Sequence, residues 1–120
     1  MVFTAVALLN PSTAQEKTKW KEMETFHGVM STTFHPAEEG KFEPIRTRSG
    51  EMLEKAIAWK NSTAPEGYNQ EAVQKILVKL VKGAKKGDNL VKKSASDTDL
   101  KEQLTELHGI FHEIAEKCQH

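Results

Sequence analysis

Cysteine, proline, aromatic residues and net charge are all scarce in this sequence of 120 residues. Its single cysteine, Cys118, cannot form a disulfide within the chain, so it is a small buried hydrophobe, an intermolecular bridge or a thiolate ligand. The 17 basic and 17 acidic side chains cancel, so no overall field attracts the chain to nucleic acid or to an anionic membrane. We therefore expect neither partner, and the length predicts a single domain.

Long hydrophobic runs are also missing. The stretch MVFTAVALLNPSTAQEKTKW has no charge before Glu16, but its apolar run is well short of the roughly 20 residues that span a bilayer. It suits the central region of a secretory signal, and Ser12 and Ala14 supply the small residues that precede a cleavage site.

We therefore predict that residues 1–14 are a signal peptide and that residues 15–120 are a periplasmic or secreted domain without a membrane span. Because a basic first region is absent, the signal is truncated and Met1 is internal to a longer leader. A short N-terminal tail without function is the alternative.

No motif of a hydrolytic or redox enzyme is present. HExxH, GxSxG, a glycine-rich phosphate loop and the haem-attachment motif CxxCH are all absent. We therefore predict that the protein is not an enzyme.

The sequence predicts helices only, because no run of residues alternates apolar and polar side chains as a half-buried strand would. Four amphipathic helices are expected, over residues 17–34, 44–61, 70–94 and from 96 to the end. Pro36, Gly40 and Pro44 interrupt the chain between the first two, and Ser96 can cap the last. Short connections between four helices favour an all-α fold, the antiparallel up-down-up-down four-helix bundle.

Each predicted helix carries a core stripe at spacings of three and four residues. In chain order the stripes are Trp20, Met23, His27, Met30 and Phe34; Ile45, Ser49, Met52, Ala56 and Trp59; Val73, Leu77, Leu80, Ala84, Gly87 and Val91; and Leu100, Leu104, Leu107, Phe111, Ile114 and Cys118. The third helix is rich in lysine and the fourth in acid, so the two are complementary. In this topology the first and fourth helices are neighbours.

His108 and His112 lie four residues apart, which places both imidazoles on one face of the last helix. Two histidines at this spacing can hold one metal ion. The spacing also arises by chance, so surface or interface histidines are the alternative. On the neighbouring helix we expect His27 to face inward, where a buried imidazole needs partners for its nitrogens, and His35 to end the helix.

These residues predict a transition-metal site, for Zn or Cu, formed by His27, His108 and His112 with His35 as the fourth ligand. Imidazole ligands suit Zn, Cu and Ni, whereas Mg and Ca prefer oxygen. The predicted role is metal binding, storage or sensing.

Other donors lie near these histidines in the sequence. Glu38 and Glu39 are either solvated acids, oxygen ligands, or acceptors that fix a histidine tautomer. Met30, about one turn from His27, is a candidate ligand that would favour Cu(I).

The segments EMETFHGVM and LHGIFHEI resemble the first and last helices of the four-helix-bundle cytochromes, the soluble b-type and cytochrome c-prime. The resemblance implies a haem b electron-transfer protein in which Met23 or His27 is the axial ligand opposite His112. His108 and Phe111 stand where cytochrome c-prime has its attachment cysteines, which excludes covalent haem.

The segments TFHPAEEG and LHGIFHEIAEKC also resemble a group of small exported helical proteins from Bacteroidota bacteria, over nearly the whole mature chain. The histidines shared by that group imply a bound metal. A third hypothesis is a structural bundle whose histidines do no chemistry. Its acidic fourth helix or lysine-rich third helix would then meet a partner protein, or the chain would form a homodimer.

Overall fold

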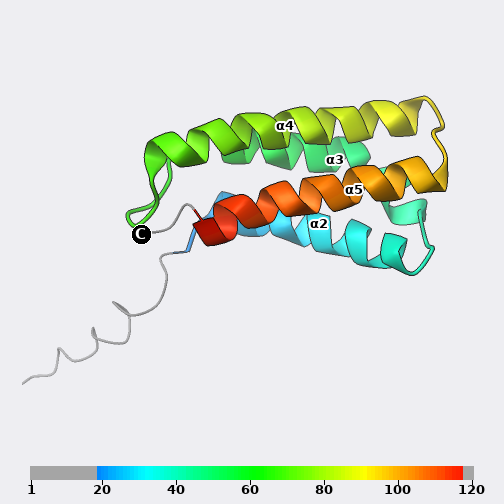
Figure 1. Ribbon diagram of the computed structural model, residues 1–120, viewed down its shortest axis with the longest axis horizontal. Helices are drawn as coiled ribbons and strands as arrows, with labels where there is room; N and C mark the ends of the chain where they lie inside the picture. Colours follow the sequence, from blue (N-terminus) through cyan, green and yellow to red (C-terminus); the bar gives the residue numbers. More distant parts are fainter. Residues whose placement is uncertain (1–18, 118–120) are drawn as a thin grey trace, which may run out of the picture.

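The computed structural model describes residues 19–117, which form four α-helices and a final π-helical turn (Figure 1). The helices are α2 (Lys21–Glu38), α3 (Glu43–Lys60), α4 (Gln70–Lys92) and α5 (Asp97–His112), and the turn is η1 (Glu113–Lys117). Each helix packs against the next one, and α5 returns to lie beside α2. The predicted all-α four-helix bundle is confirmed.

Two predictions fall on the ends of the chain, because the signal peptide of residues 1–14 and the role of Cys118 both lie outside the described residues. Among the helices of residues 19–117, none combines the length and the apolar composition needed to cross a membrane.

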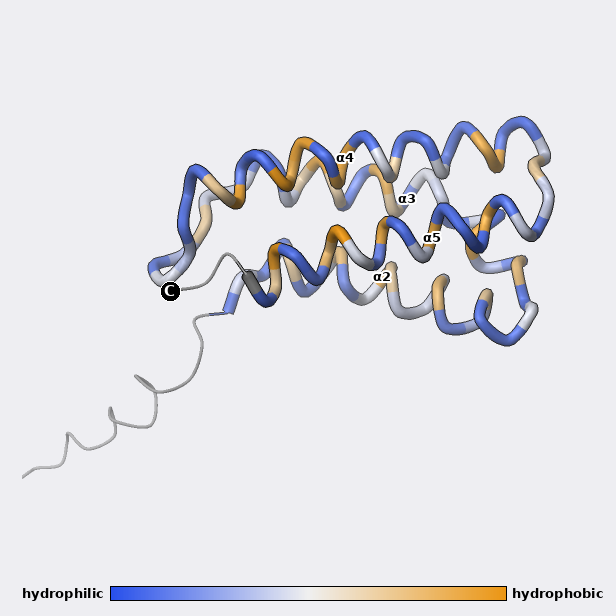
Figure 2. The backbone as a smooth tube through the Cα atoms, viewed as in Figure 1, coloured by the Kyte–Doolittle hydropathy of each residue, from blue (hydrophilic) through white to orange (hydrophobic). Residues whose placement is uncertain are grey.

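The core is built mainly from the stripes that the residue spacing predicted. In α3 the five predicted positions are buried, and in α4 five of the six are buried while Val91 is half-buried. The described positions of the predicted stripe in α5 and η1 are also buried, and they are Leu100, Leu104, Leu107, Phe111 and Ile114; Gln103, which was not predicted, is buried beside them. Figure 2 shows hydrophobic residues recurring between hydrophilic ones along each helix. One face of each helix is thus directed into the bundle.

α2 begins later and ends about one turn later than predicted. Pro36 lies inside its last turn, where the missing N–H removes only one backbone hydrogen bond, and the buried Ala37 holds this turn against the core. Gly40, with φ of 85°, then allows the chain to reverse while Lys41 N donates to Pro36 O at 2.8 Å. The prediction that Pro36 breaks the helix is wrong.

α5 begins at the predicted cap and then approaches α4 closely. Ser96 Oγ accepts a hydrogen bond from the backbone N–H of Asp99 at 3.1 Å. Further along, a Cβ added to Gly83 of α4 would lie 3.0 Å from Leu107 Cδ1 of α5. The absence of a side chain at residue 83 therefore sets the separation of these two helices.

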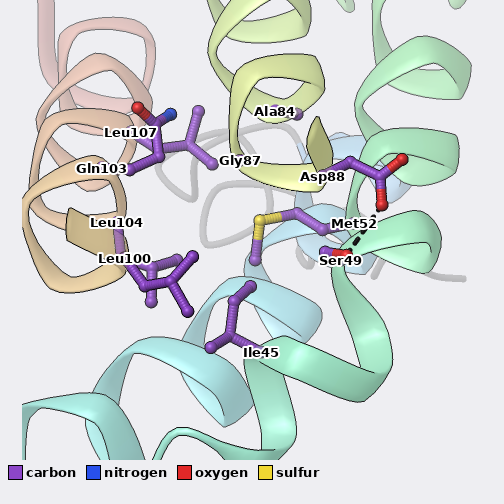
Figure 3. A pocket seen from close by; sticks show the side chains of 10 residues that line it. All are labelled: Ile45, Ser49, Met52, Ala84, Gly87, Asp88, Leu100, Gln103, Leu104 and Leu107. Carbon is purple, nitrogen blue, oxygen red and sulfur yellow. Dashed lines mark hydrogen bonds between the residues drawn. The ribbon is translucent and has the colours of Figure 1, made fainter. Parts of the chain in front are cut away.

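A small polar group is buried where α3, α4 and α5 meet (Figure 3). Asp88 accepts a hydrogen bond from Ser49 Oγ at 2.7 Å and pairs with Lys92 Nζ at 3.0 Å. The hydrogen bond from Ser49, reinforced by Lys92, lowers the pKa of Asp88 below its ordinary value. Both side chains border a cavity of about 10 Å³, which is too small for a ligand larger than water.

Replacing Leu104 with Ala should lower the free energy of unfolding by about 2 to 5 kcal/mol, because this side chain is 2% exposed and its removal leaves a cavity. Ile57, on the outside of α3, is 41% exposed, so Ile57→Ala is a matched control that should cost no more than about 1 kcal/mol. Urea unfolding measures both values. Equal small losses at the two positions would contradict the register of α5.

The carboxylate of Asp88 should make stability depend on pH. Because its pKa is lower in the folded state, its contribution is complete above its ordinary pKa of about 3.8 and is lost as the pH falls below that value. Urea unfolding at several pH values measures this effect. The difference in the free energy of unfolding between the unchanged protein and Asp88→Asn should shrink between about pH 5 and about pH 3, the range that surrounds the ordinary pKa of an aspartate. A constant difference over this range would contradict the lowered pKa.

Candidate metal-binding site

The described histidines all lie on α2 and α5, the two neighbouring helices that are furthest apart in the sequence. His27 and His35 are on α2, and His108 and His112 are on α5. The fifth histidine, His120, is outside the described residues. The predicted juxtaposition of the first and last helices is therefore present.

His108 and His112 form the closest histidine pair that the structure describes. Their ring centroids are 4.4 Å apart and their planes are nearly perpendicular, at 83°. His112 Nδ1 lies 2.8 Å from Glu116 Oε2, and the His112 side chain is 44% exposed. A carboxylate on one ring nitrogen fixes the tautomer and leaves the other nitrogen, Nε2, as the acceptor for a metal ion.

His108 is half-buried and lies flat on an aromatic ring of α2. Its ring centroid is 4.5 Å from that of Phe34, and the two planes are inclined by 25°. Burial lowers the pKa of His108, and the proximity of His112 lowers it further. Both effects favour the neutral imidazole, which is the form that binds metals.

His27 does not face inward, so that prediction is wrong. Its side chain is exposed and its ring is stacked on Phe111 of α5, with a centroid distance of 4.8 Å and an interplanar angle of 6°. His27 Nε2 lies 3.3 Å from Ser31 Oγ. The buried stripe of α2 instead passes through Phe26, Val29, Met30, Thr33, Phe34 and Ala37. His27 is one position from this stripe and covers the edge of the core.

His35 does not end its helix, because α2 continues past it. Its side chain is 65% exposed, and its Nδ1 lies 3.2 Å from Glu38 Oε1 within the same helix. Of the roles considered for Glu38, the structure shows that of an acceptor at a histidine. Glu39 instead pairs with Lys41 at 3.7 Å. Phe34 is the nearest described ring to His35, at a centroid distance of 6.0 Å and an inclination of 41°.

Six rings therefore follow one another across the α2–α5 edge, in the order His27, Phe111, His112, His108, Phe34 and His35, with neighbouring centroids 4.4 to 6.0 Å apart. We call this row the ring belt. His108 and His112 occupy its centre, while a phenylalanine separates each α2 histidine from the pair. Among residues 19–117, no three His, Cys, Asp or Glu side chains are grouped so that they could hold one metal ion. The belt thus brings two of the four predicted ligands together.

The methionines predicted as ligands pack within the bundle. Met30 is completely buried in the core, so it is not positioned to add a soft donor to the histidine pair. Met23 is half-buried, and its Sδ lies 3.8 Å from Tyr68 Oη.

A haem between Met23 and His112 would meet a filled core. The rings of Phe26, Trp59 and Phe111 are all buried and pack against one another with centroids 5.5 to 6.2 Å apart. A porphyrin inserted among these rings would have to displace them. The haem alternative stays a prediction.

Three features of the site were not expected from the sequence. The first is the stacking of His27 and His108 on phenylalanines of the opposite helix, for which no local sequence signal exists. The second is Glu116, whose spacing of four residues from His112 on a helix was a usable signal. η1 itself, a π-helical turn directly after the pair, was also not expected.

Comparisons of the chain with models of known protein families, with curated proteins and with solved structures found no match. The resemblances to four-helix-bundle cytochromes and to exported Bacteroidota proteins stay predictions.

The pKa of His108 can be tested directly by NMR titration of the imidazole protons. We expect His108 to titrate below its ordinary pKa of 6.5. Replacing His112 with Gln should move this pKa upward, because a neighbouring positive charge is removed. His35→Gln, at an outlying position of the ring belt, is the control and should move it less, since His35 contributes less to the shift. A pKa at or above 6.5 in the unchanged protein would contradict the burial of His108.

Proposed function

We propose that this protein binds a transition metal ion, zinc or copper, through His108 and His112 on the surface of α5. The observation that carries the proposal is the geometry of this pair. The two imidazoles lie one helical turn apart, and Glu116 contacts Nδ1 of His112, which leaves Nε2 for the metal. A carboxylate behind a histidine is the usual partner that orients a metal ligand and increases its basicity. His108 adds a second ring that burial keeps neutral.

The chemistry of the donors supports zinc or copper over other metals. Imidazole is a ligand for Zn, Cu and Ni, whereas Mg and Ca select oxygen donors. With two protein ligands on an exposed face, the ion stays exchangeable, which fits storage or sensing better than a permanent structural role. We further propose that the protein does this outside the cytoplasm, on the basis of the leader composition, and that it has no enzymatic activity.

A partner protein is the second candidate function, and the lysines of α4 favour it. Lys75, Lys82 and Lys85 are exposed on this helix, and no ion pair with residues 19–117 neutralises them. An acidic protein surface is the chemistry that such a face would recognise.

Metal binding should stabilise the fold, because only the folded chain presents the pair. Zinc at a hundredfold excess over its dissociation constant should add about 2.7 kcal/mol to the free energy of unfolding. Thermal unfolding with and without zinc measures the effect. The increase should disappear when His108 and His112 are both replaced with Ala, and it should weaken as the pH falls through the lowered pKa of His108.

His35→Ala is the matched control, because it removes an exposed histidine that also has a carboxylate partner. This variant should keep the full response to zinc. A zinc response that survives the double replacement on α5 would refute the proposal.

A further inference from the structure

The pair on α5 supplies only half of the ligands that its metal requires. Zinc in protein sites is nearly always bound by four ligands in a tetrahedral arrangement. His108 and His112 provide two, and among residues 19–117 no third His, Cys, Asp or Glu completes a group with them. If the proposed function holds, two coordination positions remain to be filled from outside the pair.

The α2 histidines are not placed to fill them. His27 lies flat on Phe111, which is 5% exposed, so moving the imidazole toward the pair would uncover an apolar ring. His35 is held by Glu38, and the ring of Phe34 lies between His35 and His108 in the ring belt.

We infer that the missing ligands come from a second copy of this chain, with one zinc ion shared between two α5 helices. If a two-fold axis passes through the ion, each copy presents the same surface to the other and contributes its own two imidazoles, which gives four ligands in total. The resulting site has four histidine nitrogens and needs no ligand other than His108 and His112 of each copy.

The surface around the pair permits this approach. His112 is 44% exposed, and Gly109, which lies between the two ligands in sequence, is exposed with open space where a side chain would be. Thr105, one turn before Gly109, is also exposed and small. The formal net charge of zero means that two copies do not repel each other through their overall charge.

The test is a titration of the full chain with zinc chloride at pH 7.5. Calorimetry gives the stoichiometry, and light scattering after size exclusion gives the mass. We expect one zinc per two chains and a doubling of the mass that a chelator reverses. One zinc per chain with an unchanged mass would overturn the shared site but not the proposed function, whereas no zinc uptake would overturn both. A dimer that forms without zinc would overturn the shared site.

Variants identify the ligands. His108→Ala and His112→Ala should each stay at the monomer mass in zinc, while the control His35→Ala should still double it. Cys118→Ser should also dimerise, and its failure to do so would show that a thiolate or disulfide links the copies instead.

A further variant keeps both ligands and blocks the second copy. Gly109→Arg places a long side chain on the exposed face beside the pair, at a position where a Cβ meets no neighbouring atom within 4 Å. We expect it to bind one zinc per chain, more weakly, and to remain monomeric. A doubled mass in this variant would overturn the proposed approach of the two α5 helices.

Discussion

Burial of the α5 stripe fixes the rotation of that helix, and the rotation decides where its histidines point. Leu104, Leu107 and Phe111 are at most 5% exposed, so turning α5 by one residue, about 100°, would move this stripe out of the core. On the α4 side, Leu107 lies so close to Gly83 that a Cβ there would be 3.0 Å from Leu107 Cδ1. With the stripe facing inward, His108 and His112 fall on the edge of α5 that meets α2. Their direction is therefore a result of core packing.

The edge between α2 and α5 is covered by imidazoles where a bundle would ordinarily use aliphatic side chains. Such a ring can lie flat on phenylalanine and still present a nitrogen to water, as amphipathic side chains do at the border of a core. His27 covers Phe111 in this way and His108 covers Phe34. Stacking alone needs no carboxylate behind a ring. What distinguishes His112 from His35, which also has a carboxylate partner, is the second imidazole of His108 beside it.

Most of the fold could be predicted from spacing, because α3, α4 and α5 each have one apolar stripe that dominates. α2 was harder. Two overlapping stripes share Met30 and Phe34 in this segment, and only the packing against the other helices selects the one that excludes His27. The end of the helix was also missed, because α2 continues through Pro36 to bury Ala37. Of the site, the spacing of the α5 pair was predictable, whereas the phenylalanines between the pair and the α2 histidines were not.

The core of residues 19–117 consists of apolar side chains from all four helices, and His108 and His112 lie at its edge. Structural zinc sites usually hold together chains too small to bury an adequate core, and such chains unfold when the metal is removed. Here Trp20, Phe26 and Trp59 are each at most 2% exposed in a core formed by the side chains of the bundle itself. If the α5 pair binds an ion as proposed, that ion could bind and dissociate while the bundle stays folded. The occupancy of the proposed site would then follow the concentration of free metal, and a site completed by a second copy would convert that concentration into a change of assembly.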